Sequence, residues 1–128
     1  GLAAALAMLT MATTGTAFAA TSFWQPVYYT NVGYNASTVK KVANADHAYI
    51  RVTESNHNEL STNYLVTRAD NGVQMTQGAF VISNGDRSRK SNPYKSGYYQ
   101  YSGNCVLRIN AAQQEANYTV WGEWNPNG

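Results

Sequence analysis

Asp46-His-Ala-Tyr-Ile-Arg-Val-Thr-Glu54 decides the fold class. Apolar and polar residues alternate along this stretch, so that Ala48, Ile50 and Val52 share one face of an extended chain. A period of two residues predicts a β-strand with one face against a core. Residues 46–54 should therefore form a strand, and the rest of the chain should supply its partners.

Similar segments recur along the chain and are separated by turn residues. Asn71-Gly72 favours a β-hairpin, and Pro26 favours an edge position for the first strand. Regularly spaced strands with strong turn signals predict an all-β domain. We expect a single antiparallel β-sandwich of about seven strands, with a closed barrel as the alternative. The expected strands span residues 23–32, 46–54, 60–69, 73–82, 97–101, 105–110 and 117–124.

An apolar segment without charge, residues 1–12, precedes this domain. Ala17-Phe-Ala19 follows, with small residues at the positions that a signal peptidase recognises. The pattern predicts a helical signal peptide over residues 1–19, truncated at its own start and cleaved after Ala19 or Ala20. The alternatives are a buried helix or a retained membrane anchor. We therefore expect a secreted β-domain over residues 20–128.

Composition narrows the function classes. Only 12% of the residues are charged and the net charge is +2, which does not favour a nucleic-acid partner. The one cysteine, Cys105, alternates with Leu107 and Ile109 and should be a small buried side chain. A reactive thiol or a link between two chains is the alternative for Cys105. We expect a monomer.

Residues suited to catalysis are sparse. The densest group is Glu54, His57 and Glu59, close to Asp46 and His47. No zinc spacing, calcium loop or G-x-S-x-G turn occurs in the sequence. We therefore expect no enzyme activity, no metal and no cofactor, and we interpret residues 54–59 as a solvated loop.

Two features indicate binding. The first is a basic loop that contains Arg87, Arg89, Lys90 and Lys95. The second is a set of aromatic residues in the last third of the chain, of which Tyr94, Tyr98, Trp121 and Trp124 are the candidates. Basic side chains attract anionic polymers and lipid surfaces, and exposed aromatic rings stack on sugars or settle at membrane interfaces. The alternatives are a solvated loop and aromatic core residues.

The C-terminal third also carries a family resemblance. Gly97-Tyr-Tyr-Gln-Tyr101, Val106-Leu-Arg108 and Tyr118-Thr-Val-Trp-Gly-Glu-Trp-Asn-Pro126 resemble the ending of a family of small exported proteins of Gram-positive bacteria. In size and export that family is similar to the lactococcin-972-like bacteriocins. The resemblance implies an antagonistic or envelope-directed role, and it assigns no functional residue.

Two functional hypotheses follow. The first is a secreted, non-catalytic and bacteriocin-like protein that acts at a bacterial cell envelope, on an anionic polymer or a lipid surface. The alternative is a carbohydrate-binding module with aromatic sugar-stacking residues. The first depends on the basic loop, and the second depends on which aromatic rings are exposed.

Overall fold

The computed structural model describes residues 19–29, 33–113 and 115–128. Nearly all of the predicted signal peptide lies outside the described residues. The described elements are β1 (Thr21–Val27), β2 (Tyr34–Lys41), β3 (His47–Ser55), β4 (Ser61–Arg68), β5 (Val81–Ser83), β6 (Lys90–Pro93), the 3₁₀ helix η1 (Ser96–Tyr98), β7 (Gly103–Ala111) and β8 (Tyr118–Asn125).

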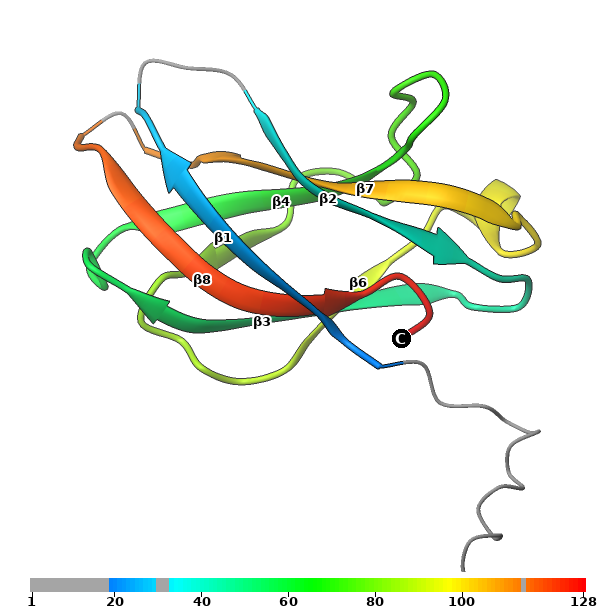
Figure 1. The fold of residues 1–128 in the computed structure, drawn as a ribbon, viewed down its shortest axis with the longest axis horizontal. Helices are drawn as coiled ribbons and strands as arrows, with labels where there is room; N and C mark the ends of the chain where they lie inside the picture. Colours follow the sequence, from blue (N-terminus) through cyan, green and yellow to red (C-terminus); the bar gives the residue numbers. More distant parts are fainter. Residues whose placement is uncertain (1–18, 30–32, 114) are drawn as a thin grey trace, which may run out of the picture.

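Two four-stranded antiparallel sheets form a β-sandwich (Figure 1), which confirms the predicted fold class. The strand order is β1-β8-β3-β6 in one sheet and β2-β7-β4-β5 in the other. As Pro26 predicted, β1 is an edge strand. The described part of the chain has eight strands, close to the seven expected.

The core lies between the two sheets and follows the alternation of the sequence. Ala48, Ile50 and Val52 of β3 are fully buried, and so are Cys105, Leu107 and Ile109 of β7. The alternate residues of β8, Tyr118, Val120, Gly122 and Trp124, are also buried. These strands form because every second side chain is buried. Burial stabilises the fold by about 25 cal/mol per Å² of apolar surface removed from water.

Residues 73–82 do not form the predicted returning strand; only Val81–Ser83 is a strand there. Gly78 has a φ of 51°, which breaks the extended run. Met75 instead links β4 to the turn before η1 at one side of the sandwich. Its N–H donates to the Val66 carbonyl at 2.8 Å, and its carbonyl accepts from Lys95 N–H at 2.8 Å.

Residues 97–101 are also not a strand, because η1 and a turn occupy them. The N–H groups of Tyr98 and Tyr99 bond to carbonyls three residues earlier. Two strands, β2 and β6, form where the sequence predicted none. Both are rich in polar residues, so they lack the apolar alternation that predicts a strand. Backbone pairing with β7 and β3 holds them in the sheets. No helix in the described part of the chain is long and apolar enough to span a membrane.

Candidate functional site

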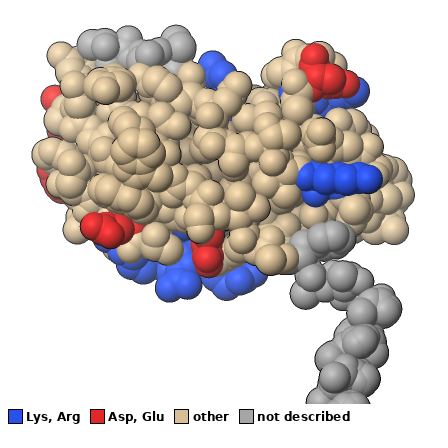
Figure 2. Space-filling model, in the orientation of Figure 1, with Lys and Arg blue, Asp and Glu red and all other residues tan. Residues whose placement is uncertain are grey.

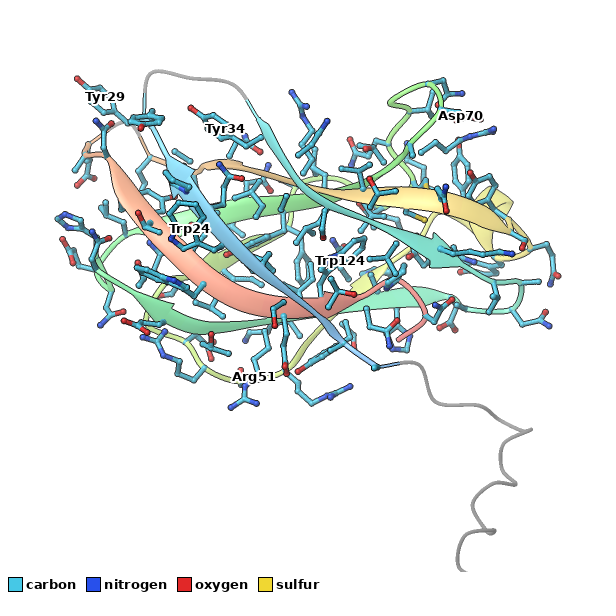
Figure 3. All side chains as sticks on the ribbon, in the orientation of Figure 1. Trp24, Tyr29, Tyr34, Arg51, Asp70 and Trp124 are labelled. Carbon is cyan, nitrogen blue, oxygen red and sulfur yellow. The ribbon has the colours of Figure 1, made fainter. Side chains whose placement is uncertain are left out.

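Two tryptophans lie side by side on the outer face of the β1-β8-β3-β6 sheet, hereafter the outer face. Trp24 of β1 pairs in register with Trp121 of β8. Trp24 is 60% exposed and Trp121 is half-buried, whereas Phe23, the neighbour of Trp24, points into the core. Figure 3 labels Trp24 beside β1 and Trp124 near the middle of the sandwich. Trp121 was a predicted candidate and Trp24 was not.

The next row of the outer face is charged. Arg51 of β3 pairs in register with Glu123 of β8, and its Nη1 lies 3.8 Å from the Glu123 carboxylate. The hydroxyl of Tyr49 donates to the same carboxylate. The guanidinium of Arg89 lies over the Tyr49 ring, 3.6 Å from its centroid, and covers it. Burial, followed by the bond to Glu123, raises the pKa of Tyr49.

The predicted basic loop folds back against this row. Arg51 Nε donates to the Arg87 carbonyl at 2.9 Å, while the Arg87 guanidinium reaches Asn58 Oδ1 at 2.9 Å and the Asn84 carbonyl. Arg51, Arg87 and Arg89 therefore form one group, hereafter the arginine cluster. Lys and Arg side chains gather along the lower edge of the molecule in Figure 2, where Figure 3 places Arg51.

Lys90 lies beside the arginine cluster but is paired. Its Nζ is 2.8 Å from Asp86, and this bond is the main reason that the pKa of Asp86 is lowered. Lys95 lies beyond the other end of β6, next to η1, so it is not part of the cluster. Of the four predicted basic residues, the structure thus places Arg87 and Arg89 beside Arg51, whereas Lys90 pairs in register with Ile50 and is bonded to Asp86.

Two predicted aromatic candidates are wrong as binding residues because they are fully buried. Trp124 lies on the inward face of β8, and its indole Nε1 donates to Ser37 Oγ at 2.7 Å. The Tyr94 hydroxyl donates to the Pro126 carbonyl at 2.7 Å. Tyr98 is half-buried and packs edge-on against Tyr101, 6.1 Å between centroids. Neither buried ring can stack on a ligand.

A shallow cleft lies elsewhere, at the turn that follows β4. Arg68 donates two hydrogen bonds to Asp70, at 3.0 and 2.7 Å, and its guanidinium lies over the Tyr101 ring. Asp70 and Arg51 project from opposite sides of the sandwich in Figure 3. Because Asp70 already occupies the guanidinium, this cleft offers no free cation for an anion.

The histidines form pairs with sequence neighbours. His57 Nδ1 lies 2.9 Å from Glu59, and His47 Nδ1 lies 2.8 Å from Asp46. These hydrogen bonds lower the pKa of both carboxyl groups. Within residues 19–29, 33–113 and 115–128, no group of three or more His, Cys, Asp or Glu side chains could hold a metal ion.

Cys105 is fully buried, as predicted, and burial raises the pKa of its thiol to about 11. Because the thiolate is the reactive form, we expect Ellman's reagent at pH 8 to label the native protein at least a hundredfold more slowly than the protein in 6 M guanidinium. Absorbance at 412 nm gives both rates. Labelling of the native protein as fast as of the unfolded one would show that Cys105 is accessible.

The geometry described above is all that characterises the outer face. No protein-family model, no curated protein and no solved structure matches this chain. The resemblance to small exported Gram-positive proteins stays a prediction.

Proposed function

We propose that this protein is a secreted, non-catalytic protein that binds a glycan of a bacterial cell envelope through its outer face. The pairing of Trp24 with Trp121 carries the proposal. Trp24, which is 60% exposed, and its half-buried register partner Trp121 place two adjacent aromatic rings on one face, and contiguous apolar surface of this kind marks binding sites.

The shape of the outer face fits an extended chain. Neighbouring strands lie about 4.8 Å apart, and successive outward residues of one strand lie about 7 Å apart. The C–H faces of pyranose rings stack on flat aromatic surfaces, and two neighbouring indoles offer places for consecutive sugars. The open face of a sheet suits a polymer better than a small molecule, which needs a concave pocket.

Glycan binding by residues 20–128 tests the proposal. Trp24→Ala and Trp121→Ala should each weaken binding to the best glycan of an array at least tenfold, equivalent to about 1.4 kcal/mol. Isothermal titration with that glycan gives the affinities, and circular dichroism checks the fold.

Tyr99→Ala is the matched control. Tyr99 is 37% exposed but belongs to the turn after η1, away from the outer face. Its replacement should leave the affinity within twofold of wild type. An array without any bound glycan, or equal loss of affinity in all three variants, would remove the proposal.

A bacteriocin-like activity at the envelope is the second candidate, and the arginine cluster favours it. Arg89 is exposed and cationic and belongs to the same face as Trp24. Purified residues 20–128 should then inhibit growth of related Gram-positive strains, and Arg89→Gln should weaken inhibition. Binding to cells without inhibition of any strain would leave glycan binding and exclude killing.

A further inference from the structure

We infer that the ligand of the outer face is a phosphate-bearing glycan and that Arg51 and Arg89 bind its phosphate group. The inference rests on the proposed function and adds the chemical class of the ligand.

Arg89 is held in place while its donors stay available. Its guanidinium lies 3.6 Å from the centroid of Tyr49, and the bond from Tyr49 to Glu123 fixes that ring. Among the described residues, none accepts a hydrogen bond from Arg89 or forms an ion pair with it. A guanidinium fixed over a ring loses less freedom when it binds an anion than a mobile one does.

Arg51 supplies a second guanidinium on the same face of β3. Its Nε is fixed by the Arg87 carbonyl at 2.9 Å, and its Nη1 is 3.8 Å from Glu123, beyond hydrogen-bond distance. The side chain of Arg51 is 44% exposed. Arg51 lies two residues from Tyr49 along β3, about 7 Å along the strand, and on the same face of the sheet as the Tyr49 ring that Arg89 covers.

The charges around this position favour an anion. The arginine cluster and Lys90 supply four cations, and Asp86 and Glu123 supply two carboxylates: Asp86 pairs with Lys90, and Glu123 pairs with Arg51 and accepts from the Tyr49 hydroxyl. Glu54 lies further along the sheet, in register with Trp121. Among the described residues, the positive charge without a carboxylate partner is thus that of Arg89 and Arg87, and Arg51 shares its charge with Glu123.

Two guanidinium groups fit phosphate better than carboxylate. A carboxylate has two oxygens, which one arginine fork can occupy in bidentate fashion. A phosphate group has further acceptor oxygens in a tetrahedral arrangement, so it can bond to two forks that approach from different directions.

The distance from the tryptophans sets the ligand's architecture. Trp121 and Arg51 lie on adjacent strands and one row apart, which is about 7 Å along the strand. A sugar on Trp24 or Trp121 can therefore place a phosphate substituent of the same or the next unit at the arginines. A lipid surface would need no such spacing.

Three matched polymers test the inference: dextran phosphate, carboxymethyl dextran with the same degree of substitution, and unmodified dextran. Residues 20–128 should bind dextran phosphate at least tenfold more tightly than the other two, measured by biolayer interferometry at constant ionic strength. Arg51→Gln/Arg89→Gln should abolish this preference.

Lys40→Gln/Lys95→Gln is the matched control, since it removes the same charge from exposed residues of β2 and the turn before η1. It should keep the preference within twofold. Absence of binding to dextran phosphate, equal binding to carboxymethyl dextran, or equal losses in the two double variants would overturn the inference. Stronger binding to phosphatidylglycerol vesicles than to dextran phosphate would assign the site to a lipid surface and overturn it too.

The experiments test the proposed function separately from the phosphate site. If Arg51→Gln/Arg89→Gln has no effect but Trp24→Ala weakens glycan binding, glycan binding stands and the phosphate site is wrong. If neither change alters binding of any glycan, both are wrong.

Discussion

Trp124→Ala is expected to destabilise the domain by about 3–5 kcal/mol, the range for deleting a buried aromatic side chain. Trp124 is fully buried between the sheets, and its Nε1 donates to Ser37 Oγ of β2 at 2.7 Å. The change therefore leaves a cavity and removes a hydrogen bond that joins the two sheets. Urea unfolding of residues 20–128, followed by far-UV circular dichroism, measures the free energy of unfolding.

Trp24→Ala is the control, because the same side chain is removed from an exposed position. It should change the free energy of unfolding by less than about 0.5 kcal/mol, as surface substitutions do. Similar losses for Trp24→Ala and Trp124→Ala would mean that the inward and outward faces of β1 and β8 have been assigned wrongly.

In β8, the motif on which the predicted family resemblance depends is a packing pattern. Tyr118, Val120 and Trp124 all point inward. At Gly122 an added Cβ would collide with the Arg51 carbonyl and the Phe23 ring. The glycine lets β8 pass close to both, so the sequence Tyr-x-Val-x-Gly-x-Trp satisfies the core and contributes only its alternate positions to the outer face.

The sequence predicted the fold wherever local alternation determines burial, as in β3, β7 and β8. It failed at residues 97–101, where tyrosines mimic a strand but short-range hydrogen bonds form η1. It also missed β2 and β6, whose polar residues gain their extended form from neighbouring strands. Pairing between strands that are far apart in the sequence decides such segments.

The candidate site was only partly predictable, because contacts between residues far apart in the sequence assemble it. The composition of the basic loop predicted Arg87 and Arg89 as binding residues. Arg51 and Tyr49 belong to the site only because residues 86–89 cross the outer face of β3, a contact of high sequence separation. The sequence also contained a signal for Trp24. Phe23 and Val27 lie on the same face of an extended chain and are apolar, so Trp24 must lie on the opposite, outward face.

Lys41→Ala is the second substitution with a large expected effect. It should lower the free energy of unfolding by about 2–4 kcal/mol, because it leaves carbonyls unpaired and opens a cavity. Lys41 is fully buried, and burial lowers the pKa of its ammonium group. Its Nζ donates to the carbonyls of Tyr99 at 3.0 Å and Tyr101 at 3.3 Å, and lies 5.0 Å from the centroid of Tyr94. The lysine thus fixes the turn after η1 against the end of β2.

Lys40→Ala is the control for this prediction, since Lys40 is the exposed neighbour on the same strand. It should cost less than about 0.5 kcal/mol in the same urea experiment. Equal, small changes for both lysines would mean that Lys41 does not hold the turn in solution.

Lys41→Met separates hydrogen bonding from packing, because methionine fills a similar volume without donors. After this change Tyr99 keeps a bond from Asn44 N–H at 2.8 Å, whereas the Lys41 bonds to Tyr101 and Val42 are lost. The expected loss is about 1–2 kcal/mol, smaller than for Lys41→Ala because no large cavity forms. Stability at or above that of wild type would instead show that burying the ammonium group costs more than its hydrogen bonds return.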